Sequence, residues 1–223
     1  MKEYVPPTLT VDAVIFQLID DVLHVALIQR ARDPFKGAYA LPGGYSAAGE
    51  TTVEAVQRIT ETKTGIKPDQ LKHFEQLYTF DTVARDPRGH AVSIAYMGLG
   101  LEISTKESDT TESPRFVPVD SLPELAYDHA NIIEYAHERL ANKVTYTNAI
   151  RALLPSELTL THLQKAYEAV FGRELDKRNF RKKFMKLELI KETGNMYQDG
   201  AHRPAKLYTF KQKSLQTLMR SFD

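Results

Sequence analysis

Arginines beside turns are the first residues of this sequence that could bind a ligand. Arg30 opens the segment RARDPFKG, and Arg85 and Arg88 lie in the segment FDTVARDPRGHAVSIAY. A guanidinium at the end of a strand can donate two parallel hydrogen bonds to a phosphate. We therefore expect Arg30, Arg85 and Arg88 to bind a phosphate-bearing ligand. A solvated Asp-Pro turn is the alternative for Arg85 and Arg88.

The segment LPGGYSAAGETTVEAVQRITETKTGI, residues 41–66, joins a glycine pair to a predicted helix. It resembles the Nudix box, G-x5-E-x7-R-E-U-x-E-E-x-G-U, where U is apolar. After LPGG, the matching positions are Gly44, Glu50, Arg58, Gly65 and Ile66. The segment around Arg85 and Arg88 also resembles its counterpart in Nudix proteins that act on ADP-ribose. The resemblance implies a pocket for such a ligand, bordered by Gly43, Gly44 and Glu50.

Three glutamates of this box are absent, because the sequence has Ile59, Thr62 and Lys63 at their positions. Positions i, i+3 and i+4 share one face of a helix, where three carboxylates could hold Mg²⁺ through oxygen ligands. Such a metal would activate water and neutralise a pyrophosphate. Here an ammonium would repel the cation. We therefore predict no catalytic residue, no metal site and no required cofactor. For Glu50 and Arg58, the alternatives to a ligand contact are a helix cap and an ion-pair partner, respectively.

Aromatic side chains could stack an adenine in this pocket. The candidates are Phe74, Tyr78, Phe80 and Tyr96. Alternating aromatic residues in strands are usually part of the core, so we assign the stacking role to none of them.

A basic helix is predicted over residues 176–187. On a helical wheel, Phe180, Phe184 and Leu187 share one side, which should face a core. The opposite side and its flanks carry the basic residues Lys177, Arg178, Arg181, Lys182, Lys183 and Lys186. Asp176 is a suitable N-cap. The pattern fits a recognition helix in a DNA major groove. The proposed DNA contacts are Lys177, Arg178, Arg181, Lys182 and Lys186. A charged helix face that only contacts solvent is the alternative.

The elements around this helix predict a winged helix. Helical segments at residues 148–154 and 160–171 precede it, and strands at residues 189–193 and 207–210 follow it. The connection between the two strands, GNMYQDGAHRPAK, is glycine-rich and basic. Its residues His202, Arg203 and Lys206 are placed to reach the DNA backbone or the minor groove.

Charge separates the two parts of the 223-residue chain. Residues up to Lys143 include 14 basic and 21 acidic side chains, whereas the remainder includes 15 and 8, so net charges of −7 and +7 cancel in the whole. We predict two domains, residues 1–143 and 144–223. The sequence has no cysteine, which excludes disulfides and thiolate metal sites. It shows no signal peptide and no run of 18 apolar residues, so we expect a cytoplasmic protein without membrane partners.

The first domain is predicted to be an α/β sandwich with a mixed sheet. Strands are expected at residues 9–16 and 22–28, joined by a turn at Asp20-Asp21, and at residues 72–80, 91–103 and 115–119. Helices are expected within residues 51–66 and 121–140, and residues 30–50 are expected to form a loop. Alternation of strands and helices is typical of this class.

Together, the altered Nudix box and the winged helix resemble the Nudix-related transcriptional regulators of NAD metabolism. That family implies a homodimeric repressor of genes for NAD synthesis or salvage, with ADP-ribose as the effector that releases a palindromic operator in double-stranded DNA. An active Nudix pyrophosphatase on ADP-ribose or NADH is the competing hypothesis. A module that binds RNA or another protein through the basic tail is the third.

Overall fold

The computed structural model describes residues 3–106, 113–198 and 204–218. The chain divides into two compact units: an N-terminal unit of residues 1–17 and 24–136, and a C-terminal unit of residues 18–23 and 137–223. The first is an α/β structure on a mixed sheet and the second is a small winged helix, which confirms the predicted fold class. In the described part of the chain, no helix has the length and apolar character that crossing a bilayer requires.

The predicted hairpin is present. Strands β1 (Thr8–Ile19) and β2 (Val22–Gln29) are neighbours in the sheet. The turn residues Asp20 and Asp21 both have left-handed backbones, with φ of 49° and 61°. Two successive residues of this kind form the turn whose twist matches that of a hairpin.

The sheet continues on both sides of this hairpin. Within the described residues its main order is β3-β2-β1-β6-β5, with β4 paired to β1 and β7 paired to β2. Strands β5 (Leu71–Phe80), β6 (Ala91–Gly100) and β7 (Arg115–Pro118) confirm the three later predicted strands, of which β6 ends before residue 103. Strand β6 runs parallel to β1 and antiparallel to β5, so the sheet is mixed.

The segment predicted as a loop contains two short strands, β3 (Tyr39–Ala40) and β4 (Gly43–Tyr45). Strand β4 pairs antiparallel with β1, with Asp12 opposite Gly43. A Cβ atom on Gly43 would lie 1.8 Å from Asp12 Oδ1 and 2.8 Å from the carbonyl oxygen of Val11. Glycine is therefore required for this close approach, although it disfavours strands in general, which is why the sequence pattern did not reveal β4.

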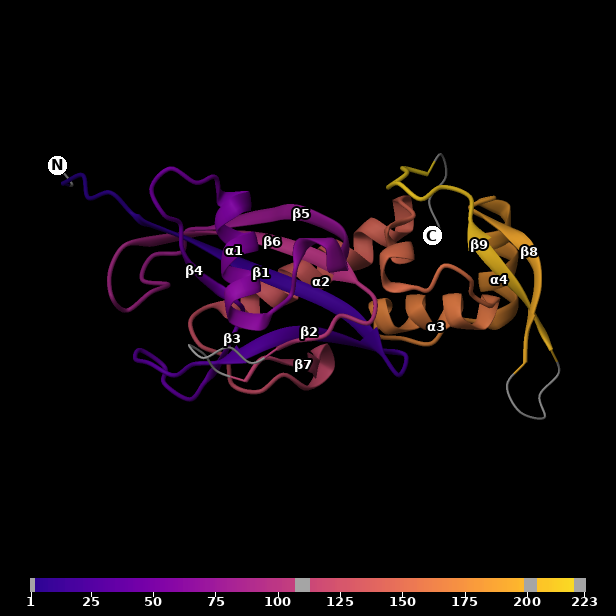
Figure 1. The fold of residues 1–223 in the computed structure, drawn as a ribbon, viewed down its shortest axis with the longest axis horizontal. Coiled ribbons are helices and arrows are strands. Elements are labelled where there is room, and N and C mark those ends of the chain that lie inside the picture. The colour runs from indigo at the N-terminus through magenta and orange to yellow at the C-terminus, as the bar shows by residue number, and fades with distance from the viewer. Residues whose placement is uncertain (1–2, 107–112, 199–203, 219–223) are drawn as a thin grey trace. The chain divides into compact units, whose positions relative to one another are not determined.

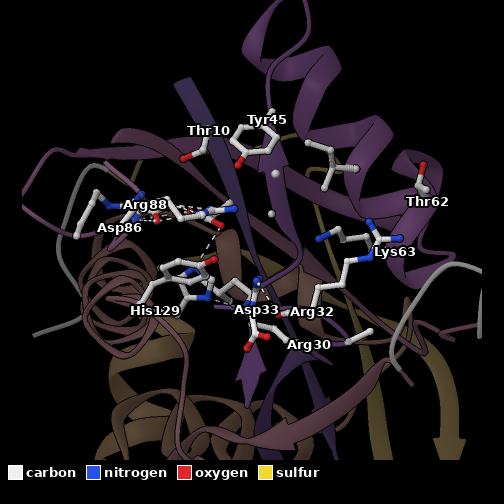
Figure 2. Close-up of a pocket in the computed structure, with 18 of the residues that line it drawn as sticks. Thr10, Arg30, Arg32, Asp33, Tyr45, Thr62, Lys63, Asp86, Arg88 and His129 are labelled. Atoms are coloured by element: carbon white, nitrogen blue, oxygen red, sulfur yellow. Dashed lines mark hydrogen bonds and ion pairs between the residues drawn. The ribbon is translucent and has the colours of Figure 1, made fainter. Parts of the chain in front are cut away.

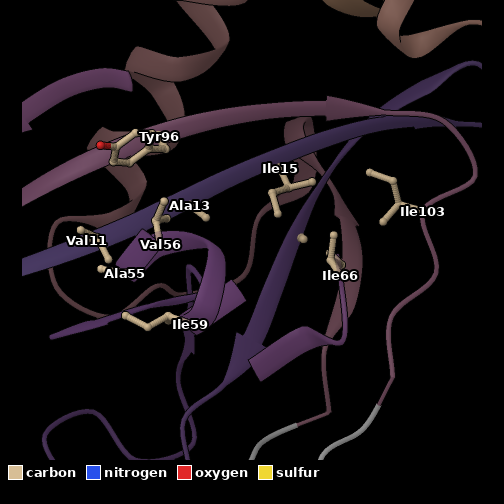
Figure 3. Packing of buried hydrophobic residues seen from close by; sticks show 10 residues of the cluster. Val11, Ala13, Ile15, Ala55, Val56, Ile59, Ile66, Tyr96 and Ile103 are labelled. Atoms are coloured by element: carbon tan, nitrogen blue, oxygen red, sulfur yellow. The ribbon is translucent and has the colours of Figure 1, made fainter. Parts of the chain in front are cut away.

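Helix α1 (Thr52–Thr64) has the limits that its sequence predicts. Thr51 and Glu54 form a reciprocal capping box at its start, and Gly65 ends it with a φ of 71°. Its buried side chains Ala55, Val56 and Ile59 pack against alternate residues of β1 (Figure 3). In the N-terminal unit, α1 covers one face of the sheet and the start of α2 covers the other (Figure 1).

Helix α2 (His129–Tyr146) begins and ends later than predicted. A short 3₁₀ turn, η2 (Val119–Ser121), comes before it, and Pro123 disfavours helix in the residues that precede it. The backbone from residue 124 to 126 instead bonds to Tyr39: the amide of Tyr39 donates to the carbonyl of Glu124, and the amide of Ala126 donates to the carbonyl of Tyr39. A second 3₁₀ turn, η1 (Pro68–Gln70), follows α1.

The C-terminal unit has the predicted order of helices. The first helical segment is a 3₁₀ turn, η3 (Ala149–Leu153), which precedes α3 (Leu160–Phe171) and α4 (Lys177–Lys186). The fully buried ring of Tyr167 on α3 contacts Phe180 and Phe184 of α4. These aromatic contacts fix the side of α4 that faces the core.

Strands β8 (Ile190–Tyr197) and β9 (Ala205–Phe210) pair antiparallel and form the wing. Strand β8 is four residues longer at its end than the predicted strand at 189–193. Gly194, with a φ of 87°, lies where the register between the strands shifts. A bulge at a glycine lets the pairing continue past the point where the sequence pattern indicates a loop.

Candidate functional site

A cavity of about 630 Å³ opens in the N-terminal unit beside β1, β4 and α1 (Figure 2). Five of the six residues predicted to bind the ligand line it: Arg30, Gly43, Gly44, Arg85 and Arg88. The sixth, Glu50, lies outside the lining. The sequence therefore placed five of the twenty residues that line this cavity, and the geometry below separates the roles of its arginines.

Arg85 is part of a buried ion-pair network. Its Nε and Nη2 atoms donate to the two carboxylate oxygens of Asp128, at 2.9 and 2.7 Å, and Nη2 lies 3.6 Å from Asp12 Oδ2. Its side chain is only 5% exposed. The predicted fork of two hydrogen bonds is present, but a carboxylate of the same chain accepts it, so Arg85 supports the cavity wall rather than presenting free donors to a ligand.

His129, the first residue of α2, extends this network to the loop before β4. Its Nδ1 accepts a hydrogen bond of 2.9 Å from the Leu41 amide, so in the neutral ring the proton is on Nε2, which lies 3.5 Å from Asp12 Oδ1. Burial lowers the pKa of His129. The ring is therefore neutral near pH 7 and holds the Leu41 backbone in place. No motif in the sequence marked His129 or Asp12.

Arg88 and Arg30 line the cavity beside Tyr127. Arg88 pairs with Asp86, and this hydrogen bonding lowers the pKa of Asp86 and raises that of Arg88. The Arg88 guanidinium also lies 5.6 Å from the ring centre of Tyr45 and 5.7 Å from that of Tyr127. Arg30 donates hydrogen bonds to the carbonyls of Pro34 and Arg32. These acceptors are uncharged, so the two hydrogen bonds do not neutralise the positive charge of Arg30.

The aromatic residues of the cavity are Tyr45 and Tyr127, which the sequence analysis did not select. The four earlier candidates are all outside its lining. Phe74 stacks on Tyr96 at a ring-centre distance of 5.3 Å, on the side of the sheet core. Tyr78 and Phe80 contact Tyr135 of α2. Their alternation reflected packing, whereas Tyr127 has a left-handed backbone, with a φ of 56°, in an irregular segment that periodicity does not identify.

Glu50 and Arg58 form an ion pair with each other. Arg58 Nη2 lies 2.5 Å from Glu50 Oε1, and Arg58 Nε donates to Oε2 at 3.0 Å. This hydrogen bonding, together with a bond from the Ala47 amide, lowers the pKa of Glu50. The alternative of a structural role thus describes both residues, and a ligand contact for Glu50 is not supported by its position.

The helix face that would hold a metal does not fit one. Ile59 is 5% exposed and belongs to the hydrophobic cluster under α1, and the Thr62 hydroxyl donates to the carbonyl of Arg58 at 2.7 Å. Lys63 brings a positive charge to the cavity wall. Among the described residues, no group of three His, Cys, Asp or Glu side chains could hold an ion. Magnesium needs oxygen ligands, which this face does not supply.

The basic helix α4 presents its charges as predicted, with one difference. Lys177, Arg178, Lys182 and Lys186 are exposed, while Phe180 and Phe184 are buried. Arg181 is half-buried and its Nη2 donates to the Thr161 hydroxyl of α3 at 3.2 Å. Arg181 therefore contacts the neighbouring helix α3, whereas the helical pattern placed it on the side of α4 opposite the core.

Lys206 of the wing pairs with Glu192 on the adjacent strand, at 2.9 Å, and both side chains remain about half exposed, at 59% and 51%. Such exposed pairs are weak and can open at little cost. His202 and Arg203 lie outside the described residues. On α4, the exposed basic residues are Lys177, Arg178, Lys182, Lys183 and Lys186; we call them the α4 basic face.

Comparison with known proteins agrees with these two units. The NUDIX domain matches residues 8–136 and the NrtR DNA-binding winged helix domain matches residues 150–210. The ADPR responsive transcriptional repressor NtrR of Acinetobacter baylyi is 33% identical over 214 residues, which are 94% of this chain and 84% of that protein. An ADP-ribose pyrophosphatase of Methanocaldococcus jannaschii is 37% identical over 131 residues, 59% of this chain and 73% of that protein.

Two crystal structures of Shewanella oneidensis NrtR are also similar. The complex with a 27mer DNA has a TM-score of 0.79 and 32% identity, and the match covers 96% of this chain and 99% of that one. The NUDIX domain complexed with ADP ribose has a TM-score of 0.56 and 35% identity, over 61% of this chain and 90% of that one. The resemblance inferred from the box and the wing is confirmed: this chain belongs to the Nudix family and, over nearly its whole length, to the NrtR group of transcriptional regulators.

Proposed function

We propose that this protein is a transcriptional repressor that binds double-stranded DNA through its C-terminal unit and ADP-ribose through its N-terminal unit. The full-length similarity to NrtR, whose structures contain DNA in one case and ADP ribose in another, carries this proposal. The α4 basic face and the cationic cavity support it, since both are suited to phosphates. As the family resemblance implies, we extend the proposal to genes of NAD synthesis or salvage.

The N-terminal unit is proposed to bind its ligand without hydrolysing it. Hydrolysis in the Nudix manner needs carboxylates that bind metal, and Ile59, Thr62 and Lys63 supply none. A pyrophosphatase on ADP-ribose is the second candidate function, because the ADP-ribose pyrophosphatase of M. jannaschii is similar to the N-terminal unit. Magnesium-dependent release of AMP from ADP-ribose, at about 1 per second or faster, would favour that candidate.

We further propose a homodimer that binds a palindromic operator. Recognition helices of a two-fold dimer meet half-sites about 34–36 Å apart, one turn of DNA. A ligand can release the operator only by binding better to an arrangement that fits DNA poorly. Coupling of this kind changes affinity by about 5- to 150-fold.

A gel shift tests the proposal directly. Full-length protein is titrated onto duplex DNA from upstream of NAD genes, with and without ADP-ribose, and onto single-stranded DNA and RNA of the same sequence. We expect preference for the duplex and weaker binding with ADP-ribose. Calorimetry should then give the reciprocal effect, with DNA weakening ADP-ribose binding by the same factor. Equal binding to single strands would instead support a different nucleic-acid module.

A further inference from the structure

The cavity of the N-terminal unit has an excess of positive charge. Three carboxylates line it, from Asp12, Asp33 and Asp86, against six basic side chains: Arg30, Arg32, Arg58, Lys63, Arg85 and Arg88. Asp12 already accepts a hydrogen bond from Ser93 at 2.5 Å, and Asp86 accepts from Arg88. Glu50 and Asp128 pair with Arg58 and Arg85 from outside the lining, so six cations are opposed by five carboxylates in all. With His129 neutral, the small positive excess favours an anionic ligand.

Lys63 is the basic residue that occupies a position of the lost carboxylates. It lies on α1 four residues after Ile59, is half-buried and lines the cavity. Thr62 and Lys63, which are labelled in Figure 2, both line the cavity. The Thr62 hydroxyl donates a hydrogen bond to the helix backbone. Of the three residues at the positions of the lost glutamates, Ile59, Thr62 and Lys63, only Lys63 carries a positive charge.

We propose that the Lys63 ammonium takes over, toward the diphosphate of ADP-ribose, the charge-neutralising role that a divalent cation has in a metal-dependent Nudix site. This inference rests on the proposed function, and it adds that the chain binds its ligand without metal. An ammonium is a compact point charge with three donors, and its hydrogen bonds to phosphate oxygens are charge-assisted. It cannot activate water as a bound metal does, so the same substitution that supports binding removes hydrolysis.

Arg58 lies on the same helix and donates two hydrogen bonds to Glu50. Arg85 is held by Asp128. Arg30 and Arg88 lie beside Tyr127. Lys63 lines the cavity from α1, at the position of a lost carboxylate, whereas Arg30 and Arg88 line it from loops.

The test measures ADP-ribose affinity of full-length protein by calorimetry, in EDTA and in Mg²⁺. Wild-type affinity should agree within about twofold between the two buffers. Lys63→Met should weaken binding about 10- to 100-fold, as expected for the loss of a charge-assisted contact. Lys67→Met, which removes the same charge just beyond the end of α1 and outside the cavity lining, should change nothing.

Two further measurements separate this role from a structural one. Lys63→Glu replaces the ammonium with an oxygen ligand, so Mg²⁺ should improve its ADP-ribose affinity, unlike that of wild type. AMP, which lacks the diphosphate, should bind wild type and Lys63→Met alike. Wild-type binding that requires Mg²⁺, or unchanged affinity in Lys63→Met, would overturn the proposal while leaving the effector function intact. No ADP-ribose binding to wild type in either buffer would refute both.

Discussion

Arg85 tests whether the ion-pair network beneath the cavity is a structural element. In Arg85→Met, the carboxylates of Asp128 and Asp12 lose their guanidinium partner, and their side chains are only 13% and 6% exposed. Removing one partner of a buried pair leaves an uncompensated buried charge, which destabilises a protein by about 3–5 kcal/mol. For a chain of this length, about 2–4 °C in Tm accompanies each kcal/mol, so Tm should fall by about 6–20 °C.

Arg88→Met is the matched control. Arg88 also lines the cavity and pairs with a carboxylate; the side chain of Arg88 is 45% exposed, whereas that of Asp86 is 9% exposed. A pair that solvent reaches from one side lies between the exposed and the buried case, so Tm should fall less than in Arg85→Met.

Thermal unfolding followed by circular dichroism compares the two variants at one pH and salt concentration. Adding Asp128→Asn to Arg85→Met removes one of the unpaired charges and should recover part of the loss. A fall in Tm for Arg85→Met no larger than that for Arg88→Met would refute the assignment of Arg85 to a structural network, and would return it to the ligand-binding residues.

Four other outcomes are expected. His129→Asn keeps an acceptor for the Leu41 amide but does not titrate. In wild type, the unfolded chain binds a proton at His129 more readily than the folded chain, because burial lowers the pKa of His129. Below pH 6.5, the unfolding free energy of wild type should therefore fall by up to about 1.4 kcal/mol per pH unit more than that of the variant, which urea unfolding from pH 7.5 to 5.5 measures. Gly43→Ala should disrupt the pairing of β4 with β1, and loss of ADP-ribose binding in calorimetry would report it. Arg178→Ala should weaken operator binding by about 1–3 kcal/mol and relax sequence preference in gel shifts, whereas Lys186→Ala should lower affinity uniformly and reduce the salt slope by about one. Wild-type protein with Mg²⁺ should release no AMP from ADP-ribose above a no-protein blank, and turnover near 1 per second would contradict this.

The fold was predictable where local signals and burial agree. The capping residues Thr51 and Gly65 set the limits of α1, and the spacing of Phe180 and Phe184 gave the buried side of α4. The errors lie where distant contacts override local preference. Strand β4 depends on the close approach of Gly43 to β1, and the segment before α2 is held extended by Tyr39.

The candidate site was only partly predictable for the same reason. A motif gives the type and spacing of residues such as Arg85, but not which neighbour accepts their hydrogen bonds. Asp128 lies 43 residues away in sequence, and Asp12 lies on the first strand. Tyr127 and His129 have no pattern of their own, because their positions follow from an irregular turn at the start of α2. Only the folded chain brings these residues together.

The packing of Ile59 has a consequence for how this lineage can change. Regaining a metal site would require carboxylates at three positions, and one of these changes, Ile59→Glu, removes an apolar side chain from the cluster under α1 and places a carboxylate at a 5% exposed position. A penalty of several kcal/mol is a large share of a total stability of about 5–15 kcal/mol. Ile59→Glu alone supplies one of the three carboxylates, so it costs packing without completing a metal site. A laboratory search for restored hydrolysis should therefore combine all three changes in a background stabilised beforehand.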